Sequence, residues 1–310
     1  MLSVCSSIYR ETESLEIFVR SVLGNASDPS QVEVVIVNDE GYGPTTEVLA
    51  VLAGEFPQLK YLTITRPERA EFFRRTVAFY KEAGVFPVED VAEFEGTLDR
   101  YEAGELVKLW FSMAHNYNLA VAQSQGDVLM VLPSDYFCFF DATEIYRKYL
   151  EAKAGTGSFM GLLDWVAFGS LVPLPDVCGI LREPKTHGET RRFTLQCLQD
   201  ALAQNVARGK SQHGARIVDR ETFDRVGGFD GRWFVRALPD DLFNRKVMDV
   251  IPSPYGLSDR PGFQDVVCFV GSVGVGDPVV KTYFHPRYLS SEYPHEACAN
   301  MIRAFLEATA

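Results

Sequence analysis

The first 65 residues alternate between short apolar runs and stretches with apolar residues at helical spacing. The run "VEVVIV" at 32–37 is apolar and rich in β-branched residues, which is typical of a strand covered on both faces. Residues 2–8 and 60–65 predict two further strands, and the apolar positions within 15–23 and 45–53 predict the helices between them. This alternation of strands and helices predicts a parallel sheet with right-handed crossovers.

The middle of the chain adds an insertion and one more buried strand. Residues 66–104 are rich in charge and predict a helical insertion. Residues 105–122 predict a helix whose apolar face consists of Leu106, Leu109, Trp110, Met113, Ala114 and Tyr117. The segment "DVLMVL" at 127–132 predicts a fourth buried strand.

The periodicity weakens after residue 155. A helix is predicted around 189–207, and "ARIVDRETFDRVGGFDGRWF" predicts a strand, a helical turn and a Gly-Gly turn. "DDLFNRKVMDV" opens another helix, residues 266–284 contain strand-like runs, and the last 15 or so residues predict an amphipathic helix.

Two carboxylates follow predicted strands directly. Asp39 ends the second strand, and Asp135 comes shortly after the fourth in "VLPSDYF". Ligands of open α/β sheets bind beyond the carboxyl ends of the strands, so this placement favours a ligand-binding role. The alternative for both residues is an ordinary turn or loop start.

The composition narrows the class of protein. The 310 residues are 46% hydrophobic and carry a net charge of −12, which argues against a nucleic-acid-binding surface. Local basic clusters at Arg191–Arg192 and Arg216–Arg220 leave a nucleic acid open as an acceptor. The six cysteines are scattered without a CxxC pair, which predicts buried thiols in a reducing compartment and no structural zinc site.

Neither a signal peptide nor a membrane span is visible in the sequence. The first apolar run breaks at Ser6–Ser7, and no stretch approaches the roughly 18 apolar residues of a spanning helix. We therefore expect a soluble protein in the cytoplasm.

Four stretches in order resemble the family-2-like glycosyltransferases with a GT-A fold. They are "SVCSSIYRETESLEIFVRSVL", "VEVVIVNDE", "HNYNLAVAQSQGDVLMVLPSDY" and "VDRETFDRVGGFDGRWFVRALPDDLFNRKV". The resemblance implies a Rossmann-like, mostly parallel central sheet with helices on both faces and a more irregular acceptor-side half. It divides a single domain over 1–310 into a nucleotide-sugar-binding half (1–137), an acceptor-binding and catalytic half (138–290) and a C-terminal helix (291–310).

The resemblance also implies a divalent cation, Mn or Mg. The family usually places two Asp residues around a spacer here, whereas this chain has Pro133 in place of the first, so Asp135 takes the position that touches the metal. One carboxylate is a sparse site, yet these ions often bind one or two carboxylates plus substrate phosphates. His285 in "TYFHPRY" resembles a late His ligand; the alternative is an ordinary surface or core histidine.

The general base is expected near the second acidic motif. Asp240 and Asp241 stand where the family keeps its catalytic carboxylate, although Pro239 occupies the usual position of the base. Either Asp240 has shifted into the role, with Asp241 orienting the acceptor, or the base is missing. An Asp at a helix start is also an ordinary cap.

Further residues are assigned to the two substrates by the same resemblance. Asp39 is expected to accept a hydrogen bond from a uracil or guanine N–H, and the other residues on the donor side are Ser7, Tyr9, Asn118 and Ser134. Trp233 and Trp165 are expected to stack on the acceptor, although a lone Trp is more often part of a core.

The function implied is metal-dependent transfer of a sugar from a nucleotide-diphosphate sugar, with a UDP-sugar favoured, to an acceptor hydroxyl. Inversion by direct displacement needs no covalent nucleophile, and none is evident. Because both acidic motifs depart from the family pattern, a degenerate nucleotide-sugar-binding protein with the same fold is the alternative. A nucleotidyltransferase would need a glycine-rich loop after the first strand, and "SSIYRETES" has no glycine. Whether the protein forms a homo-oligomer stays open.

Overall fold

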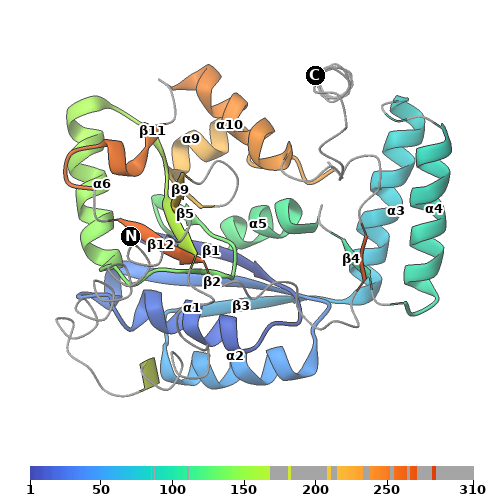
Figure 1. Ribbon diagram of the computed structural model, residues 1–310, viewed down its shortest axis with the longest axis horizontal. Helices are drawn as coiled ribbons and strands as arrows, with labels where there is room; N and C mark the ends of the chain where they lie inside the picture. The colour runs from blue at the N-terminus through green and yellow to red at the C-terminus, as the bar shows by residue number, and fades with distance from the viewer. Residues whose placement is uncertain are drawn as a thin grey trace.

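A computed structural model describes residues 1–84, 86, 88–105, 107–109, 112–167, 181–182, 208–210, 215–232, 238–251, 255–263, 266–270 and 281–283. A mostly parallel sheet lies at the centre, and helices cover both of its faces (Figure 1). This α/β architecture confirms the fold class expected from the sequence.

The central sheet has the strand order β11-β7-β10-β5-β1-β2-β3. β1 pairs in parallel with β2 and β5, and β2 pairs in parallel with β3. β10 runs antiparallel to both β5 and β7, so it interrupts the parallel order. The strand bounds are Leu2–Ile8 (β1), Val32–Asp39 (β2), Leu59–Ile64 (β3), Val128–Val131 (β5), Met160–Leu162 (β7), Arg216–Asp219 (β10) and Tyr255–Gly256 (β11).

Helices pack on the two faces because alternate strand residues point to opposite sides. Val4, Val34 and Met130 belong to a core on the side of α1, α2 and α6, whereas Cys5, Val35 and Leu129 belong to a core with α5, α9 and α10 (Figure 1). The helix bounds are Glu13–Leu23 (α1), Gly43–Glu55 (α2), Ser112–Gln123 (α5), Ala142–Thr156 (α6), Arg220–Arg225 (α9) and Leu238–Val250 (α10).

The insertion forms an antiparallel helix pair at one end of the sheet (Figure 1). α3 spans Arg66–Ala83 and α4 spans Val88–Glu102. A reciprocal capping box between Thr65 and Glu68 starts α3, and Gly84 ends it in a left-handed conformation with φ +63°. The pair has an aromatic core of its own, to which Leu242 of α10 also belongs. The insertion is therefore attached to α10 as well as to the sheet.

Two smaller sheets complete the described structure. β6 (Tyr136–Phe137), β12 (Val267–Val270), β8 (Asp164–Ala167) and β9 (Arg208–Lys210) form one of them in that order. β4 (Val107–Leu109) pairs in parallel with β13 (Lys281–Tyr283). Single turns of 3₁₀ helix lie at Pro29–Gln31 and Leu257–Asp259.

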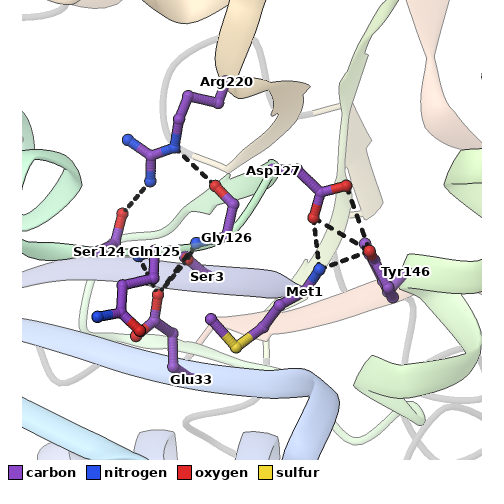
Figure 2. Close-up of polar contacts among 9 residues, drawn as sticks. All are labelled: Met1, Ser3, Glu33, Ser124, Gln125, Gly126, Asp127, Tyr146 and Arg220. Carbon is purple, nitrogen blue, oxygen red and sulfur yellow. Dashed lines mark hydrogen bonds and ion pairs between the residues drawn. The ribbon is translucent and has the colours of Figure 1, made fainter.

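A buried carboxylate joins the amino ends of three central strands (Figure 2). Glu33 accepts hydrogen bonds from the Ser3 hydroxyl at 2.6 Å and from the Gln125 main-chain N–H at 2.5 Å, and it pairs with Lys60 at 2.7 Å. A Cβ on Gly126 would lie 2.7 Å from the Ser3 nitrogen, so only glycine fits there. This network holds the turn before β5 against β1 and β2 on the edge opposite Asp39.

Most element predictions for the first 137 residues are confirmed, but the helix predicted for 105–122 was wrong in its first part. Residues 107–109 form β4, because they pair with a strand that is about 170 residues away in the sequence. The helix starts only at Ser112. The helix predicted for 189–207 and the C-terminal helix lie outside the described residues.

Three of the six cysteines lie among the described residues. Cys5, Cys138 and Cys268 are buried free thiols, as expected, and the Sγ atoms of Cys138 and Cys268 lie 3.7 Å apart. In the described part of the chain, every helix is too short or too polar to cross a bilayer.

Candidate functional site

The carboxyl ends of β1, β2 and β5 meet at one edge of the central sheet. The strand register places Ser7 beside Val37 and Ile8 beside Asn38, so Asp39 follows directly at this edge. β5 is paired with β1 up to Val131 and leads there into the loop that contains Ser134 and Asp135. The candidate residues predicted from separate stretches of sequence therefore share one edge.

Asp39 forms an ion pair with the inserted helix α3. The side chains of Asp39 and Arg69 are only 3% and 2% exposed, and Arg69 Nε lies 3.5 Å from Asp39 Oδ1. The Arg69 Nη1 atom also donates to Glu40 at 3.0 Å. Since removing one partner of a buried pair leaves an uncompensated charge, these contacts hold the insertion against the end of β2.

Cationic and phenolic side chains lie around the carboxylate of Glu40. The Tyr9 hydroxyl donates to its carboxylate at 3.2 Å, and Arg10 and Arg66 lie 3.8 and 4.0 Å away. Burial, and then the charge of Glu40, raises the pKa of Tyr9, so this hydroxyl stays protonated. Glu40 and Arg10 have φ of +67° and +57°, an uncommon conformation for residues other than glycine.

Ser134 connects two loops at the same edge. Its hydroxyl donates to Glu11 Oε2 at 2.6 Å, and the Ser14 hydroxyl donates to the same oxygen at 3.0 Å. The Thr45 hydroxyl donates to the main-chain oxygen of Glu11 at 2.9 Å. Ser134 therefore fixes the loop before Asp135 to the loop after β1.

Helix α5 supplies two asparagines with different partners. Asn116 is fully buried and donates from Nδ2 to the Ser7 hydroxyl at 2.9 Å. Asn118 accepts from the Phe229 N–H at 2.9 Å and donates to the Phe229 carbonyl at 2.7 Å. Asn118 therefore fixes the Gly-Gly turn to α5, a role that its prediction as a donor-binding residue did not include.

Tyr117 of helix α5 packs its ring 5.6 Å from the ring centre of Phe229. Its side chain is buried with 3% exposure, and burial raises its pKa well above the ordinary value. The carboxylates of Asp240 and Asp135 both raise the pKa further, whereas Arg216 lowers it. Asp135 and Asp240 are 105 positions apart in the sequence, and the charges of both influence the pKa of this one hydroxyl.

Arg216 is a fully buried cation at the start of β10. It forms an ion pair with Asp240, and its Nη1 lies 3.4 Å from Asn244 Oδ1. Its guanidinium carbon lies 4.9 Å from the ring centre of Phe229 and 5.4 Å from that of Phe243. The cation compensates the charge of Asp240 and competes with a substrate for its oxygens.

Four predicted site residues are not tested by the described side chains. The side chains of Asp241 and Trp165 lie outside the described part, although both residues belong to described elements. Trp233 and His285 lie outside the described residues altogether. Their roles stay predictions.

Asp135 alone offers a sparse donor set for a divalent cation. Among the described residues there is no group of three or more His, Cys, Asp or Glu side chains that could hold a metal ion. Asp135 is half-buried at the carboxyl edge of the sheet, where one carboxylate can serve an ion held mainly by substrate phosphates. The residues therefore fit an ion that arrives with a diphosphate, and they do not form a closed metal cage.

Three residues at this edge were not predicted from the sequence: Arg69, Arg216 and Tyr117. Arg69 lies in the charge-rich insertion, for which no apolar face was predicted, and Tyr117 was predicted only as part of the apolar face of its helix. Arg216 offered a signal, because an arginine in the apolar strand "ARIV" needs a buried partner. The identity of that partner, Asp240, depends on the tertiary structure.

Comparison with known proteins gives a match at the level of structure. S. aureus TarS 1-349 in complex with UDP-GlcNAc superposes with a TM-score of 0.52 at 14% identity, over 100% of this chain and 67% of that one. The fold is the GT-A fold of glycosyltransferases. No protein-family profile matches the chain, and no curated protein matches its sequence.

Two further structures are similar at lower scores. TarS 1-349 in another crystal structure has a TM-score of 0.49 at 15% identity, over 87% of this chain. A mannosyltransferase from Pyrobaculum calidifontis in complex with GDP-Man and Mn²⁺ has a TM-score of 0.45 at 15% identity, over 89% of this chain. The chain spans 60% and 58% of the length of these two structures.

Proposed function

We propose that the protein transfers a sugar from a nucleotide-diphosphate sugar to an acceptor hydroxyl. The observation that carries this proposal is the meeting of two acidic motifs at the carboxyl edge of a GT-A sheet: β5 leads into the loop with Asp135, and Arg216 of β10, paired with the end of β5, holds Asp240. Ligands bind at this edge in open α/β sheets. A site with one carboxylate for the donor and another for the acceptor matches the requirements of direct displacement with inversion.

The donor side comprises residues from β1, β2 and the loop after β5. Asp39 accepts an N–H of the base, and Ser7 and Tyr9 line the base or ribose. A UDP-sugar is favoured as donor, and TarS 1-349, which shares the fold, has been crystallised with UDP-GlcNAc. The half over 1–137 is the donor-binding part, and 138–290 carries the acceptor side.

A divalent cation, Mn or Mg, is proposed to bind with the donor at Asp135. When bound, such an ion neutralises negative charge on the leaving diphosphate. Asp135 would hold it through one carboxylate, and Ser134 keeps the loop in place through Glu11. His285 stays a proposed second ligand.

Asp240 is proposed as the general base that takes the proton of the acceptor hydroxyl, and Asp241 as the residue that orients the acceptor. Asp240 lies in the first turn of α10, and its side chain is 18% exposed, so a substrate can reach it. Arg216 keeps this carboxylate in place. The acceptor is proposed to stack on Trp233 and Trp165.

The second candidate is a nucleotide-sugar-binding protein without transfer activity. It is favoured by the ion pair between Arg216 and Asp240, because a carboxylate held by a buried guanidinium is a weaker proton acceptor than an unpaired one. Pro133 and Pro239 stand where the family keeps further carboxylates.

A binding and turnover assay separates these two functions. Thermal unfolding of the wild type is measured with UDP, GDP, UDP-GlcNAc and GDP-mannose, each with and without Mn²⁺. A ligand at about 100 times its dissociation constant stabilises the native state by about 2.7 kcal/mol. Stabilisation together with sugar release or transfer supports the enzyme, stabilisation without either supports the binding protein, and no stabilisation by any nucleotide contradicts both.

A further inference from the structure

Arg10 has an uncommon backbone conformation at the carboxyl end of β1. It lies two residues after Ile8, the last residue of β1, and its φ of +57° is in the left-handed region. Asn and Asp tolerate this region because their short polar side chains bond locally, a possibility that arginine lacks. Strained residues of this kind are concentrated at active sites and ligand-binding sites.

The guanidinium of Arg10 has N–H donors that the fold does not use. Its Nε is buried without a hydrogen-bond partner, and its Nη2 lies 3.8 Å from Glu40 Oε2, which is too long for a hydrogen bond. Its Cζ lies 4.9 Å from the ring centre of Tyr42, a contact that uses no donor. Because the side chain is 16% exposed, a ligand can reach it.

The two other arginines beside Glu40 are held by hydrogen bonds within the fold. Arg69 donates to Glu40 at 3.0 Å and pairs with Asp39 at 3.5 Å. Arg66 donates to two main-chain oxygens, one at the end of α4 and one just after it. Arg69 therefore compensates the charge of Glu40, and Arg10 is not needed for this purpose.

The strand order places Arg10 between the two proposed parts of the donor site. β1 lies between β2, which ends at Asp39, and β5, which leads to Asp135. Two strand spacings separate the ends of β2 and β5 by about 10 Å, so a nucleotide that reaches from one to the other crosses the end of β1. The hydrogen bond from Ser134 to Glu11 at 2.6 Å also fixes the loop of Arg10 to the loop of Asp135.

We propose that the Arg10 guanidinium binds the diphosphate of the nucleotide-sugar donor. A guanidinium offers only donors and stays charged, and phosphate oxygens are negative and only accept, so the two groups match. This inference rests on the proposed function and adds a cationic residue of this chain to its donor site. The strain at Arg10 is then explained by the position that the side chain must reach.

The substitutions Arg10→Gln and Arg10→Lys test the inference through the affinities for UDP and uridine. Both affinities are measured in Mn²⁺ from thermal shifts over a range of ligand concentrations, which also detects weak binding. Arg10→Gln should weaken UDP binding about 10- to 100-fold and leave uridine binding unchanged, since hydrogen bonds to charged groups have about this effect. Arg10→Lys should retain part of the UDP affinity, because it keeps the charge but not the planar fork.

Two further variants separate ligand binding from a structural role. Arg10→Gly should unfold at the wild-type Tm or above it, because glycine adopts a positive φ without strain, and should lose UDP affinity like Arg10→Gln. Arg225→Gln is the matched control. Arg225 is half-exposed in α9, which begins at the opposite edge of the sheet, so the same loss of charge there should leave both affinities unchanged.

Each alternative outcome overturns a defined part of the proposal. Equal UDP affinity of Arg10→Gln and wild type overturns the inference and leaves the proposed function intact. Equal weakening of uridine and UDP overturns the assignment to the diphosphate. A clear loss of Tm in Arg10→Gly shows that Arg10 supports the fold and overturns the inference as well. A wild type that UDP does not stabilise overturns the proposed function, and the inference falls with it.

Discussion

The side-chain amide of Asn118 forms hydrogen bonds with both main-chain polar groups of Phe229, at 2.9 and 2.7 Å. The main chain before Phe229 turns through Gly227 and Gly228, which have φ of +72° and +67°. A Cβ on Gly228 would lie 2.6 Å from Asn118 Oδ1, so glycine is required for this close approach. One amide thereby places the Phe229 ring, against which both Tyr117 and Arg216 pack.

Asn118→Ala is expected to destabilise the protein, because it removes both hydrogen bonds and leaves the Phe229 groups unsatisfied. The free energy of unfolding should fall by roughly 2 kcal/mol, at about 1 kcal/mol for each hydrogen bond. Urea unfolding measures this change, and the control is Glu47→Gln on the exposed face of α2, which should leave stability unchanged. A variant that keeps full stability but loses nucleotide affinity would instead favour the donor-binding role expected from the sequence.

Asp135→Asn is expected to abolish the Mn²⁺-dependent part of nucleotide binding. The amide has the same shape but lacks the negative charge that a hard cation requires. UDP affinity is measured with Mn²⁺ and with EDTA. The affinity of the variant should be the same in both, whereas the exposed control Asp224→Asn should keep the wild-type difference. If Asp135→Asn retains that difference, Asp135 is a turn residue.

Asp240→Asn is expected to lower turnover by about 10²- to 10⁴-fold with donor affinity nearly unchanged, because it removes the basicity and keeps the shape. It also leaves the buried Arg216 without its charged partner, so stability should fall by a few kcal/mol. Turnover is therefore measured at a temperature where circular dichroism shows both proteins folded.

The comparison variant for this prediction is Asp241→Asn, which changes the neighbouring position of α10. A large loss of turnover in Asp241→Asn, with little in Asp240→Asn, would assign the base to Asp241. Unchanged turnover in both would place the base elsewhere.

The stability of the protein is expected to fall on acidification through Glu33. Burial alone would raise the pKa of Glu33, but hydrogen bonds from the Gln125 N–H, Lys60 and Ser3 outweigh it and hold the pKa below its ordinary value (Figure 2). A lowered pKa contributes stability that is present above about pH 4.3, the unfolded value, and is lost as the pH falls through the folded value.

Glu33→Gln tests this contribution. At pH 7 the variant should be less stable than the wild type by about 2 kcal/mol, since it loses the charge that strengthens three hydrogen bonds. The difference should narrow below pH 4, which urea unfolding at several pH values measures. A difference that does not change with pH would show that Glu33 acts through packing alone.

The sequence by itself determined the element order of the first half and the position of two candidate carboxylates. Apolar runs such as 32–37 report burial on both faces of a strand, which is a local property and can be read from one segment. Because β1, β2 and β5 are parallel neighbours, placing Asp39 and Asp135 after strands was enough to predict that they share an edge.

Only the tertiary structure decided which distant residues complete that edge. Residues 107–109 form a strand and not a helix because residues 281–283 pair with them. Arg69 reaches Asp39 because the insertion folds back onto the sheet, and Arg216 reaches Asp240 because β10 enters the sheet antiparallel beside β5. Such contacts join segments whose local patterns are independent, so periodicity carries no information about them. For the same reason, the sequence did not single out Tyr117. Its place on an apolar helix face predicts burial but does not show which charged side chains influence the pKa of its hydroxyl.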